Sequence, residues 1–423
     1  MSHTGAILEF ATTRHDLPAA ARADALRLIA DTLATGAAGA ASPEALRLLP
    51  LVQRWGASSE ARALSGARLP AVSAAFFNGF AIHCLEWDAV HEGAVVHAMS
   101  VVTAALLAGA DRMGGCDPDA FLAALTVGVD VASGLGLAAT GPMRFFRPAT
   151  AGVIGAALAL AQLEGVSAAD ALGFACAFAG GTMQAHVEAS IALPLQIARA
   201  AQAAVQAVDL AKAGLVAPHD VLEGPFGYSA LIEPLDLARY TASLGAVWRI
   251  SEVSVKPFPS GRASHGALAA LQALRDEGVI GLDEVECIDL SAPPLVGRLV
   301  GRPYREHAAP SHNRLCLAFL APLMLRDGRI DPRLDRTVPA LARRVTVSVD
   351  GNPDLNALSP QRITVRLKDG TAVERAIPAN PGSPEAPLSP TQSAAKLDLC
   401  RELAPGADPR LFDDPLSYLT DPQ

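Results

Sequence analysis

The sequence predicts a mainly α protein, with a large all-α helical domain over residues 1–255 and a smaller α+β domain over residues 256–390. A C-terminal helical segment, residues 391–423, is expected to return to the helical domain. The composition is the first reason: 51% of the chain is hydrophobic but only 5% is aromatic. Small apolar residues suit closely packed helices because alanine loses almost no side-chain entropy in a helix. The second reason is a change from helical spacing of apolar residues, before about residue 215, to strand-like alternation from residue 345.

The helical pattern begins near the N-terminus. Leu26, Ile29 and Leu33 recur at helical spacing, so we expect a helix that Asp16 caps and that ends at Gly36. Further helices are expected after Asp117, after Ser167 and over residues 72–85 and 195–213. The apolar stretch 94–110 is expected to be a buried helix rather than a membrane span, because it has 17 residues and a span needs about 20.

Strand patterns gather in the last third of the chain. Residues 345–349 and 363–367 alternate, and Asp369–Gly370 predicts a hairpin turn into a strand over 372–377. Residues 253–255 and 285–290 are weaker strand candidates, and helices are expected after His265 and Ser311. The segment 378–390 is too rich in proline for either element, and helix resumes at 391.

Charge and cysteine content exclude several classes of protein. The formal net charge is −9 with scattered basic residues, so nucleic-acid binding is not expected. The N-terminus MSHTGAILEF lacks the basic start of a signal peptide, and we expect no membrane association. Six cysteines stand far apart without a CxxC pair, which is typical of reduced thiols and predicts a cytoplasmic protein.

The densest group of chemically able side chains lies in HCLEWDAVHEGAVVH, between two apolar helices. Its members are His83, Glu86, Asp88, His91, Glu92 and His97. Polar groups between buried helices need partners or a function, because an unpaired buried charge is costly. Three interpretations stay open: a substrate pocket with acid and base groups, a metal site, and a solvated loop with structural caps. The spacing lacks the i, i+4 pair of an HExxH helix, so no metal is expected.

A second group lies in KPFPSGRASHG, residues 256–266. Ser264 precedes a helix that is expected to begin near His265, and the N–H groups at such a helix start favour a carboxylate. Lys256 and Arg262 would strengthen that preference. The alternative is a basic linker between the domains.

A third group is MRFFRPAT, where Arg144 and Arg147 stand in an otherwise almost uncharged stretch. One interpretation is a bidentate clamp for a substrate carboxylate, and the other is a surface loop. GLGLAATG from Gly134 lies in a helical stretch without a preceding strand, so it is not a dinucleotide-binding motif. The sequence therefore favours an acid–base enzyme without a cofactor.

At these residues the sequence resembles the MmgE/PrpD family. The resemblance rests on NGFAIHCLEWDAVHEGAVVHAMS from Asn78, RPATAGVIGAALALAQLEG, DVLEGPFGYSAL and KPFPSGRASHG, four motifs in family order. It implies a large helical domain and a smaller α+β domain with the active site between them. It also implies a homodimer that needs neither metal nor nucleotide and that acts on di- and tricarboxylates by proton transfer next to a carboxylate.

The resemblance also implies roles for single residues. His97 and His265 match two family histidines, Glu86 and Asp88 match an acidic pair, and Lys256 matches as well. Three departures stand beside these matches: Arg147, Leu193 and Phe319 occupy positions where family decarboxylases have a histidine, a lysine and a tyrosine. These departures argue against decarboxylation by the known route.

The function expected from the sequence is that of a cofactor-independent lyase, a dehydratase or hydratase, acting on a small polycarboxylate. His97 and His265 are the expected general base and acid, because imidazole titrates near pH 6.5. Asp88 would orient a histidine or bind a hydroxyl, and the expected substrate-binding residues are Arg147, Lys256, Glu86, Arg262, Ser264 and His91. The alternatives are an epimerase or racemase of a dicarboxylate and a non-catalytic homologue.

Overall fold

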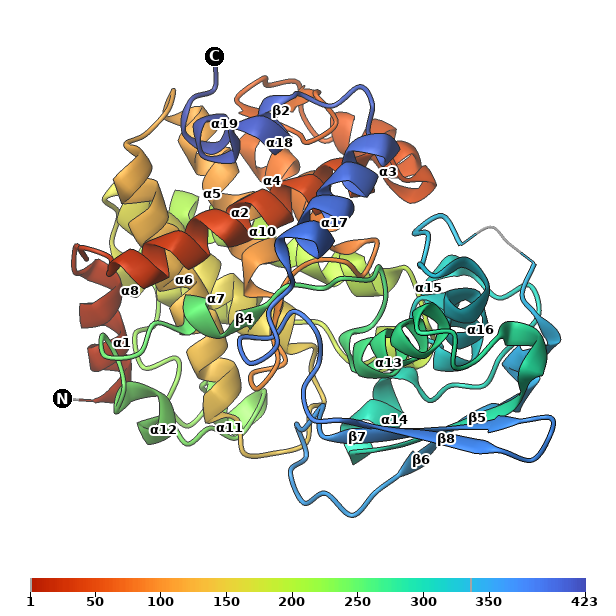
Figure 1. Ribbon diagram of the computed structural model, residues 1–423. Helices are drawn as coiled ribbons and strands as arrows, with labels where there is room; N and C mark the ends of the chain where they lie inside the picture. The colour runs from red at the N-terminus through yellow and green to blue at the C-terminus, as the bar shows by residue number, and fades with distance from the viewer. Residues whose placement is uncertain (1, 335–336) are drawn as a thin grey trace.

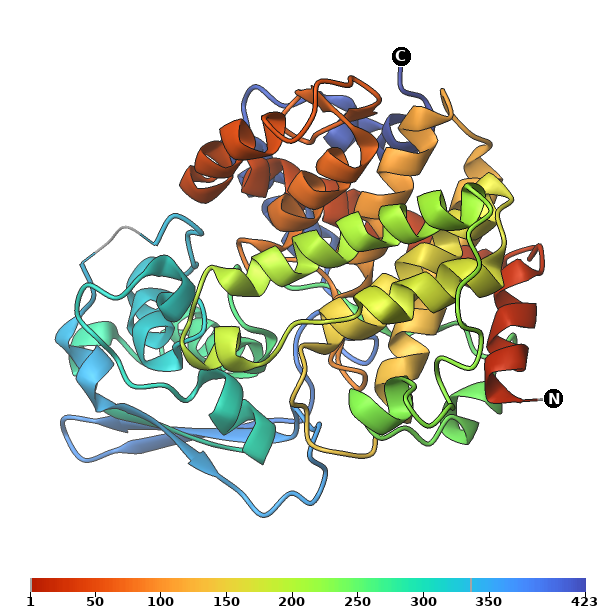
Figure 2. The ribbon, with the colours of Figure 1, turned by 180° about the vertical axis from the view of Figure 1, so that it is seen from behind.

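The chain folds as a run of helices, then a four-stranded sheet with helices of its own, then a closing group of helices (Figures 1 and 2). The structure is a computed structural model that describes residues 2–334 and 337–423. The first part contains α1 (His3–Thr12), α2 (Ala19–Ala40), α3 (Pro43–Gln53), α4 (Ala71–His83), α5 (Ala98–Arg112), α6 (Pro118–Ala138), α7 (Arg147–Glu164), α8 (Ala168–Phe178), α9 (Gln184–Val187), α10 (Ala192–Lys212), α11 (Tyr228–Leu231) and α12 (Ala238–Thr241). Four two-residue strands accompany these helices: β1 (Ala61–Arg62), β2 (Arg68–Leu69), β3 (Val90–His91) and β4 (Val253–Ser254).

The remaining elements form the sheet and the closing helices. They are α13 (His265–Asp276), β5 (Val285–Ala292), α14 (Pro294–Val300), α15 (Pro310–Asn313), α16 (Leu317–Asp327), β6 (Val345–Val349), β7 (Gln361–Leu367), β8 (Ala372–Ile377), α17 (Pro390–Leu403), α18 (Arg410–Asp413) and α19 (Pro415–Thr420). The mainly α class is confirmed, whereas the division of the chain at residue 255 stays a prediction.

Local sequence explains several of the helix starts. The side chain of Asp117 accepts a hydrogen bond from the backbone of α6, and Ser167 does the same for α8. The prediction for α2 was wrong at both ends, because the helix begins after Pro18 and continues through Gly36 to Ala40. Gly36 serves close packing instead of ending the helix: a Cβ there would lie 2.6 Å from the side chain of Leu64.

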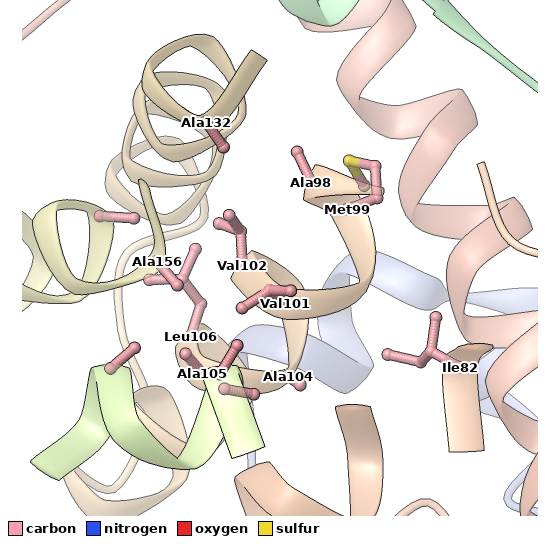
Figure 3. Close-up of a cluster of buried hydrophobic side chains, with 14 of the residues drawn as sticks. Ile82, Ala98, Met99, Val101, Val102, Ala104, Ala105, Leu106, Ala132 and Ala156 are labelled. Atoms are coloured by element: carbon pink, nitrogen blue, oxygen red, sulfur yellow. The ribbon is translucent and has the colours of Figure 1, made fainter. Parts of the chain in front are cut away.

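The larger hydrophobic core joins α2, α4, α5, α6, α7 and α10 and is built mainly from alanine, leucine and valine. Figure 3 shows Val102 of α5 facing Ala132 of α6 and Ala156 of α7. The predicted buried helix over 94–110 is confirmed as α5, which begins only at Ala98. One described helix, α6, is long and apolar enough to cross a membrane, but 89% of its apolar window is buried inside the molecule. Such burial is typical of a helix in the core of a protein.

The smaller core lies between the sheet and helices α13 and α16, which cover one face of it (Figure 1). The strand order is β6-β5-β7-β8, with β5 parallel to β6 and antiparallel to β7. The strands predicted over 345–349, 363–367 and 372–377 are confirmed, as is the turn at Asp369–Gly370, where Gly370 has a φ of +90°. The weak candidate 285–290 is β5, a central strand.

The chain then returns to the helical part. α17 packs against α2, and Cys400, Phe412 and Leu419 join the larger core. Residues 391–423 were expected to form one closing helix, but they form three, α17, α18 and α19. Pro405 and Pro415 directly follow the residues that cap the ends of α17 and α18, and they explain the breaks because proline does not continue a helix. All six cysteines are free thiols.

Candidate active site

The polar segment that follows α4 folds back toward the end of that helix. His83 is the last residue of α4, His91 lies in β3, and His97 stands directly before α5. Glu86 adopts a φ of +55°, a left-handed conformation that costs free energy for any residue other than glycine. The sharp turn at Glu86 brings Asp88 back beside His83, where the two side chains form a hydrogen bond.

Asp88 is the centre of a buried hydrogen-bond network. Its Oδ2 lies 3.0 Å from Nδ1 of His83 and 3.0 Å from Nδ1 of His97. The hydroxyl of Ser100 donates to the same oxygen. One carboxylate therefore holds two imidazole rings through their Nδ1 atoms, which leaves Nε2 as the second nitrogen of each ring.

The shared carboxylate shifts the pKa values of the two histidines in opposite directions. Burial lowers the pKa of His83, but Asp88 and Glu86 together outweigh burial and raise it above its usual value. Burial also lowers the pKa of His97, Lys256 adds to this effect, and Asp88 does not overcome it. Burial raises the pKa of Asp88, but His83, His97 and Lys256 bring it well below its usual value. Neighbouring groups with pKa values pushed apart are the arrangement that assigns one acid and one base.

Lys256 lies next to this network and is fully buried. Its Nζ lies 3.3 Å from Oε2 of Glu86 and 3.6 Å from Oδ1 of Asp88, and it donates to the backbone carbonyl of Glu86 at 3.1 Å. The structure thus brings together Glu86, Asp88, His97 and Lys256, which were four of the candidate site residues. Lys256 is already paired with two carboxylates, so we assign it to holding the network rather than to binding a substrate carboxylate.

Arg262 joins distant segments around Glu92. Its Nη2 and Nε donate to Oε1 of Glu92 at 2.6 and 3.0 Å. Glu92 also accepts from Ser254 at 2.6 Å and from Asn380 at 2.9 Å. His91 makes a separate contact, 2.9 Å from Oε2 of Glu252. Arg262 and His91 were predicted to bind substrate, but the structure places Arg262 in an ion pair with Glu92 and His91 in a hydrogen bond with Glu252.

His265 and Ser264 lie at the start of α13, as predicted, but the structure does not bring them into contact with His97. The ring of His265 is fully buried, with Nε2 3.1 Å from the carbonyl of Ser260 and Nδ1 3.3 Å from Nη1 of Arg262. Burial first, and then Arg262 and Lys256, lower the pKa of His265 well below its usual value. The hydroxyl of Ser264 donates to the carbonyl of Gly261 at 2.8 Å. Because both nitrogens of His265 are engaged, we assign it no catalytic step.

Arg147 is buried at the first turn of α7 and is bound to Glu233. Its Nη2 lies 2.6 Å from Oε1 of Glu233, and Nε lies 2.9 Å from both carboxylate oxygens. The predicted carboxylate clamp exists, but its carboxylate belongs to the protein. The neighbouring Arg144 is exposed.

A small cavity of about 60 Å³ lies beside the two imidazole rings. Its polar lining consists of His83, Glu86, Glu92, His97, His186 and Arg262, and its apolar lining includes Phe146, Leu193 and Leu315. A larger cavity of about 520 Å³ lies between α2 and α17, but among the described residues it gathers no histidine. We place the candidate site in the smaller cavity because the acid–base groups lie there.

Two arginines near this cavity were missed in the sequence. Arg302 donates through Nη2 to the carbonyl of His186 at 3.0 Å, while its buried Nη1 has no partner within the described chain. Arg314 donates through Nη2 to the carbonyl of Pro332, and its buried Nε is likewise unpartnered. Among residues 2–334 and 337–423, neither guanidinium forms an ion pair with a carboxylate. No motif contains either arginine, so only the fold could identify them.

The donor atoms of His83, Asp88 and His97 lie within 4.8 Å of one another and offer a set that a metal ion could use. The ammonium group of Lys256 stands 3.6 Å from Asp88, and a second cation beside it would be repelled. The donor set therefore suits proton transfer better than metal binding.

The fold and the site define a mainly α protein in which two histidines are hydrogen-bonded to one buried carboxylate. Residues 10–238 match the MmgE/PrpD N-terminal domain and residues 258–408 match the MmgE/PrpD C-terminal domain. The chain belongs to the MmgE/PrpD family, which confirms the resemblance seen in the motifs.

Curated relatives agree with this membership. The chain is 28% identical to cis-aconitate decarboxylase of Homo sapiens over 399 residues, which cover 85% of this chain and 80% of the relative. It is 29% identical to cis-aconitate decarboxylase of Mus musculus over 339 residues, covering 72% and 66%. A cis-aconitate decarboxylase-like protein of Aspergillus oryzae is 28% identical over 285 residues, covering 62% and 58%.

Proposed function

We propose that this chain is a lyase that removes water from a small hydroxylated di- or tricarboxylate, or adds water in the reverse direction, without metal or nucleotide. The observation that carries the proposal is the pair His83 and His97 on Asp88, with pKa values shifted apart beside one cavity. A general acid and a general base at adjacent positions are what the elimination of water requires.

In this reaction each of the two histidine rings, His97 and His83, carries out one proton transfer. Nε2 of neutral His97 takes the proton from the carbon next to a carboxylate. The C–O bond then breaks with its electron pair on oxygen, and His83 protonates the departing hydroxide to give water and a carbon–carbon double bond. Negative charge that develops on the substrate carboxylate is stabilised by nearby cations.

Arg302 and Arg314 are the groups that we assign to the substrate carboxylates. The other buried cations near the site already have carboxylate partners within the protein. Arg262 pairs with Glu92, Lys256 pairs with Glu86 and Asp88, and Arg147 pairs with Glu233. Arg314 lines a second small cavity, which shares Glu86, Leu193 and Leu315 with the first. Two guanidinium groups without a carboxylate partner suit a ligand with two carboxylates.

Decarboxylation is the second candidate, because two of the three relatives described above are cis-aconitate decarboxylases. In that reaction a C–C bond breaks, CO2 leaves, and His83 would protonate the carbon that keeps the electron pair. Epimerisation fits less well. It needs groups on opposite faces of one carbon, whereas the rings of His83 and His97 have centroids only 4.7 Å apart.

The test is product analysis by NMR in D2O with hydroxylated and unsaturated di- and tricarboxylates. We expect loss or addition of water with the wild-type chain, and turnover slower by about 10²-fold or more with His97→Asn or His83→Asn. His15→Asn is the matched control, because that ring contacts the carbonyl of Phe10 instead of the cavity. Release of CO2 would favour the decarboxylase, and solvent deuterium without elimination would favour the epimerase. If no acid is turned over or raises the melting temperature, the non-catalytic homologue is the better description.

A further inference from the structure

His186 is a third histidine of the cavity, and the acid–base chemistry described above does not use it. It lies in α9, a four-residue helix, and only 5% of the residue is exposed. Its carbonyl is held by Arg302 at 3.0 Å, and the carbonyl of Ala189 is held by Ser311. These contacts fix the position of the segment, so the ring is presented to the cavity by a backbone that is bound on both sides.

The two ring nitrogens of His186 differ in their surroundings. The ring forms a hydrogen bond with the backbone of Leu299 that raises its pKa, which means that the ring donates. Nε2 has no partner in the described chain, and we therefore assign the donated proton to Nδ1. Burial and the charge of Arg302 lower the pKa of His186 to about 4, and the ring is therefore neutral near pH 7. Neutral imidazole with a proton on Nδ1 carries a lone pair on Nε2.

An unpartnered acceptor on a residue that lines this cavity selects for one kind of ligand group. An ionised carboxylate cannot donate to a lone pair, and neither can a carbon–carbon double bond. An ammonium group can donate, but Arg298 and Arg302 both act on this ring as nearby positive charges and would repel it. A hydroxyl group is neutral and can donate.

We propose that Nε2 of His186 accepts a hydrogen bond from a hydroxyl group of the substrate, so that the site selects hydroxylated over hydroxyl-free polycarboxylates. The inference rests on the proposed function, because it assumes a polycarboxylate in this cavity. It adds the residue that reads the hydroxyl group and thereby narrows the substrate class. A buried polar group that loses its partner is costly, and such sites discriminate strongly against ligands that lack the group.

The experiment uses ligand pairs that differ only by one hydroxyl group: citrate against tricarballylate, and malate against succinate. Affinities are measured by titration calorimetry with the full chain. We expect wild-type protein to bind at least one hydroxylated acid about tenfold or more tightly than its hydroxyl-free partner. In His186→Leu this preference should disappear while the affinity for the hydroxyl-free acid stays unchanged. His186→Gln, whose amide oxygen can accept, should keep part of the preference.

The control is His15→Leu, which removes another histidine that binds a backbone carbonyl but lies outside the cavity. It should keep the wild-type preference. Equal binding of both members of each pair by wild-type protein would overturn the role of His186 alone. An unchanged preference in His186→Leu would also overturn it. Binding of none of the four acids would overturn the proposed function and this inference with it.

Discussion

His83 and His97 share a single oxygen atom: Nδ1 of each ring lies 3.0 Å from Oδ2 of Asp88. The rings meet edge to face, with an angle of 73° between their planes. Because the carboxylate binds the same nitrogen in both rings, it fixes the tautomer of the neutral ring and stabilises the charge of the protonated one.

Asp88→Asn should therefore abolish most of the activity without preventing folding. The amide keeps the shape but removes the charge that raises the pKa of His83 and orients both rings. We expect kcat to fall by about 10²- to 10⁴-fold. The control is Asp130→Asn, a buried carboxylate that binds Tyr240 and the backbone of Arg249. Equal loss of activity in both variants would show a general structural effect instead.

The rate should depend on pH through two limbs. On the acid side His97 gains a proton, and because its pKa is lowered, this limb lies below the usual value of about 6.5. On the alkaline side His83 loses its proton, and because its pKa is raised, that limb lies above 6.5. We therefore expect kcat to reach a plateau around neutral pH when it is measured in fixed-time assays from about pH 5 to 9. The pH profile of the residual activity of His83→Asn should lack the alkaline limb. If the alkaline limb persists in this variant, it belongs to another group.

Close packing between α6 and α7 should make the stability of the protein sensitive to substitution of Gly155. A Cβ at Gly155 of α7 would lie 2.2 Å from the carbonyl oxygen of Gly128 in α6. Backbone atoms cannot move aside easily, so Gly155→Ala should lower the free energy of unfolding by about 1–3 kcal/mol. Gly406→Ala is the control, since nothing lies within 4 Å of its Cβ position. Denaturant unfolding compares the two, and equal stability would contradict the close approach.

The fold was predictable where the pattern is local. Alanine-rich periodicity and caps such as Asp117 predict helices, and the alternation around Val347 and Val365 predicts strands. Helix ends were less predictable, because Gly36 reads as a stop signal but is needed where α2 packs against Leu64. That requirement comes from a residue 28 positions away, and no local pattern contains it.

Arg147 provides a test of stability rather than of substrate binding. Arg147→Ala leaves the carboxylate of Glu233 buried without its partner, and breaking a buried pair in this way costs about 3–5 kcal/mol. Thermal unfolding should show the loss, while the double variant with Glu233→Ala should recover part of it. Arg144→Ala, at an exposed position three residues earlier, should be neutral. A raised KM with unchanged stability would restore the clamp predicted from the sequence.

The residues of the hydrogen-bond network around Asp88 were predictable from the sequence, whereas the pairing of the surrounding arginines was not. Asp88, His97 and Lys256 stand in motifs dense in polar residues, and the fold brings them together. The partners that neutralise Arg147 and Arg262 lie 86 and 170 residues away from them. Sequence alone therefore could not tell a paired arginine from a free one. The same limit hid His186, Arg302 and Arg314, whose relevance comes from the atoms that remain unpartnered after folding.

Replacement of the two unpaired arginines should weaken substrate binding while leaving the chemistry intact. Arg302→Met and Arg314→Met keep much of the side-chain volume but remove the charge. We expect each to raise KM for a dicarboxylate about 10- to 100-fold, because a hydrogen bond to a charged group contributes about 1.5–3 kcal/mol, with kcat changed little.

A monocarboxylate offers a sharper comparison, since it has one anionic group and should lose affinity in only one of the two variants. Arg305→Met is the matched control, because Arg305 is exposed and lies three residues from Arg302. Steady-state kinetics on both acids separates these effects. If KM stays constant and kcat falls instead, the guanidinium groups act on the transition state rather than on the bound carboxylates.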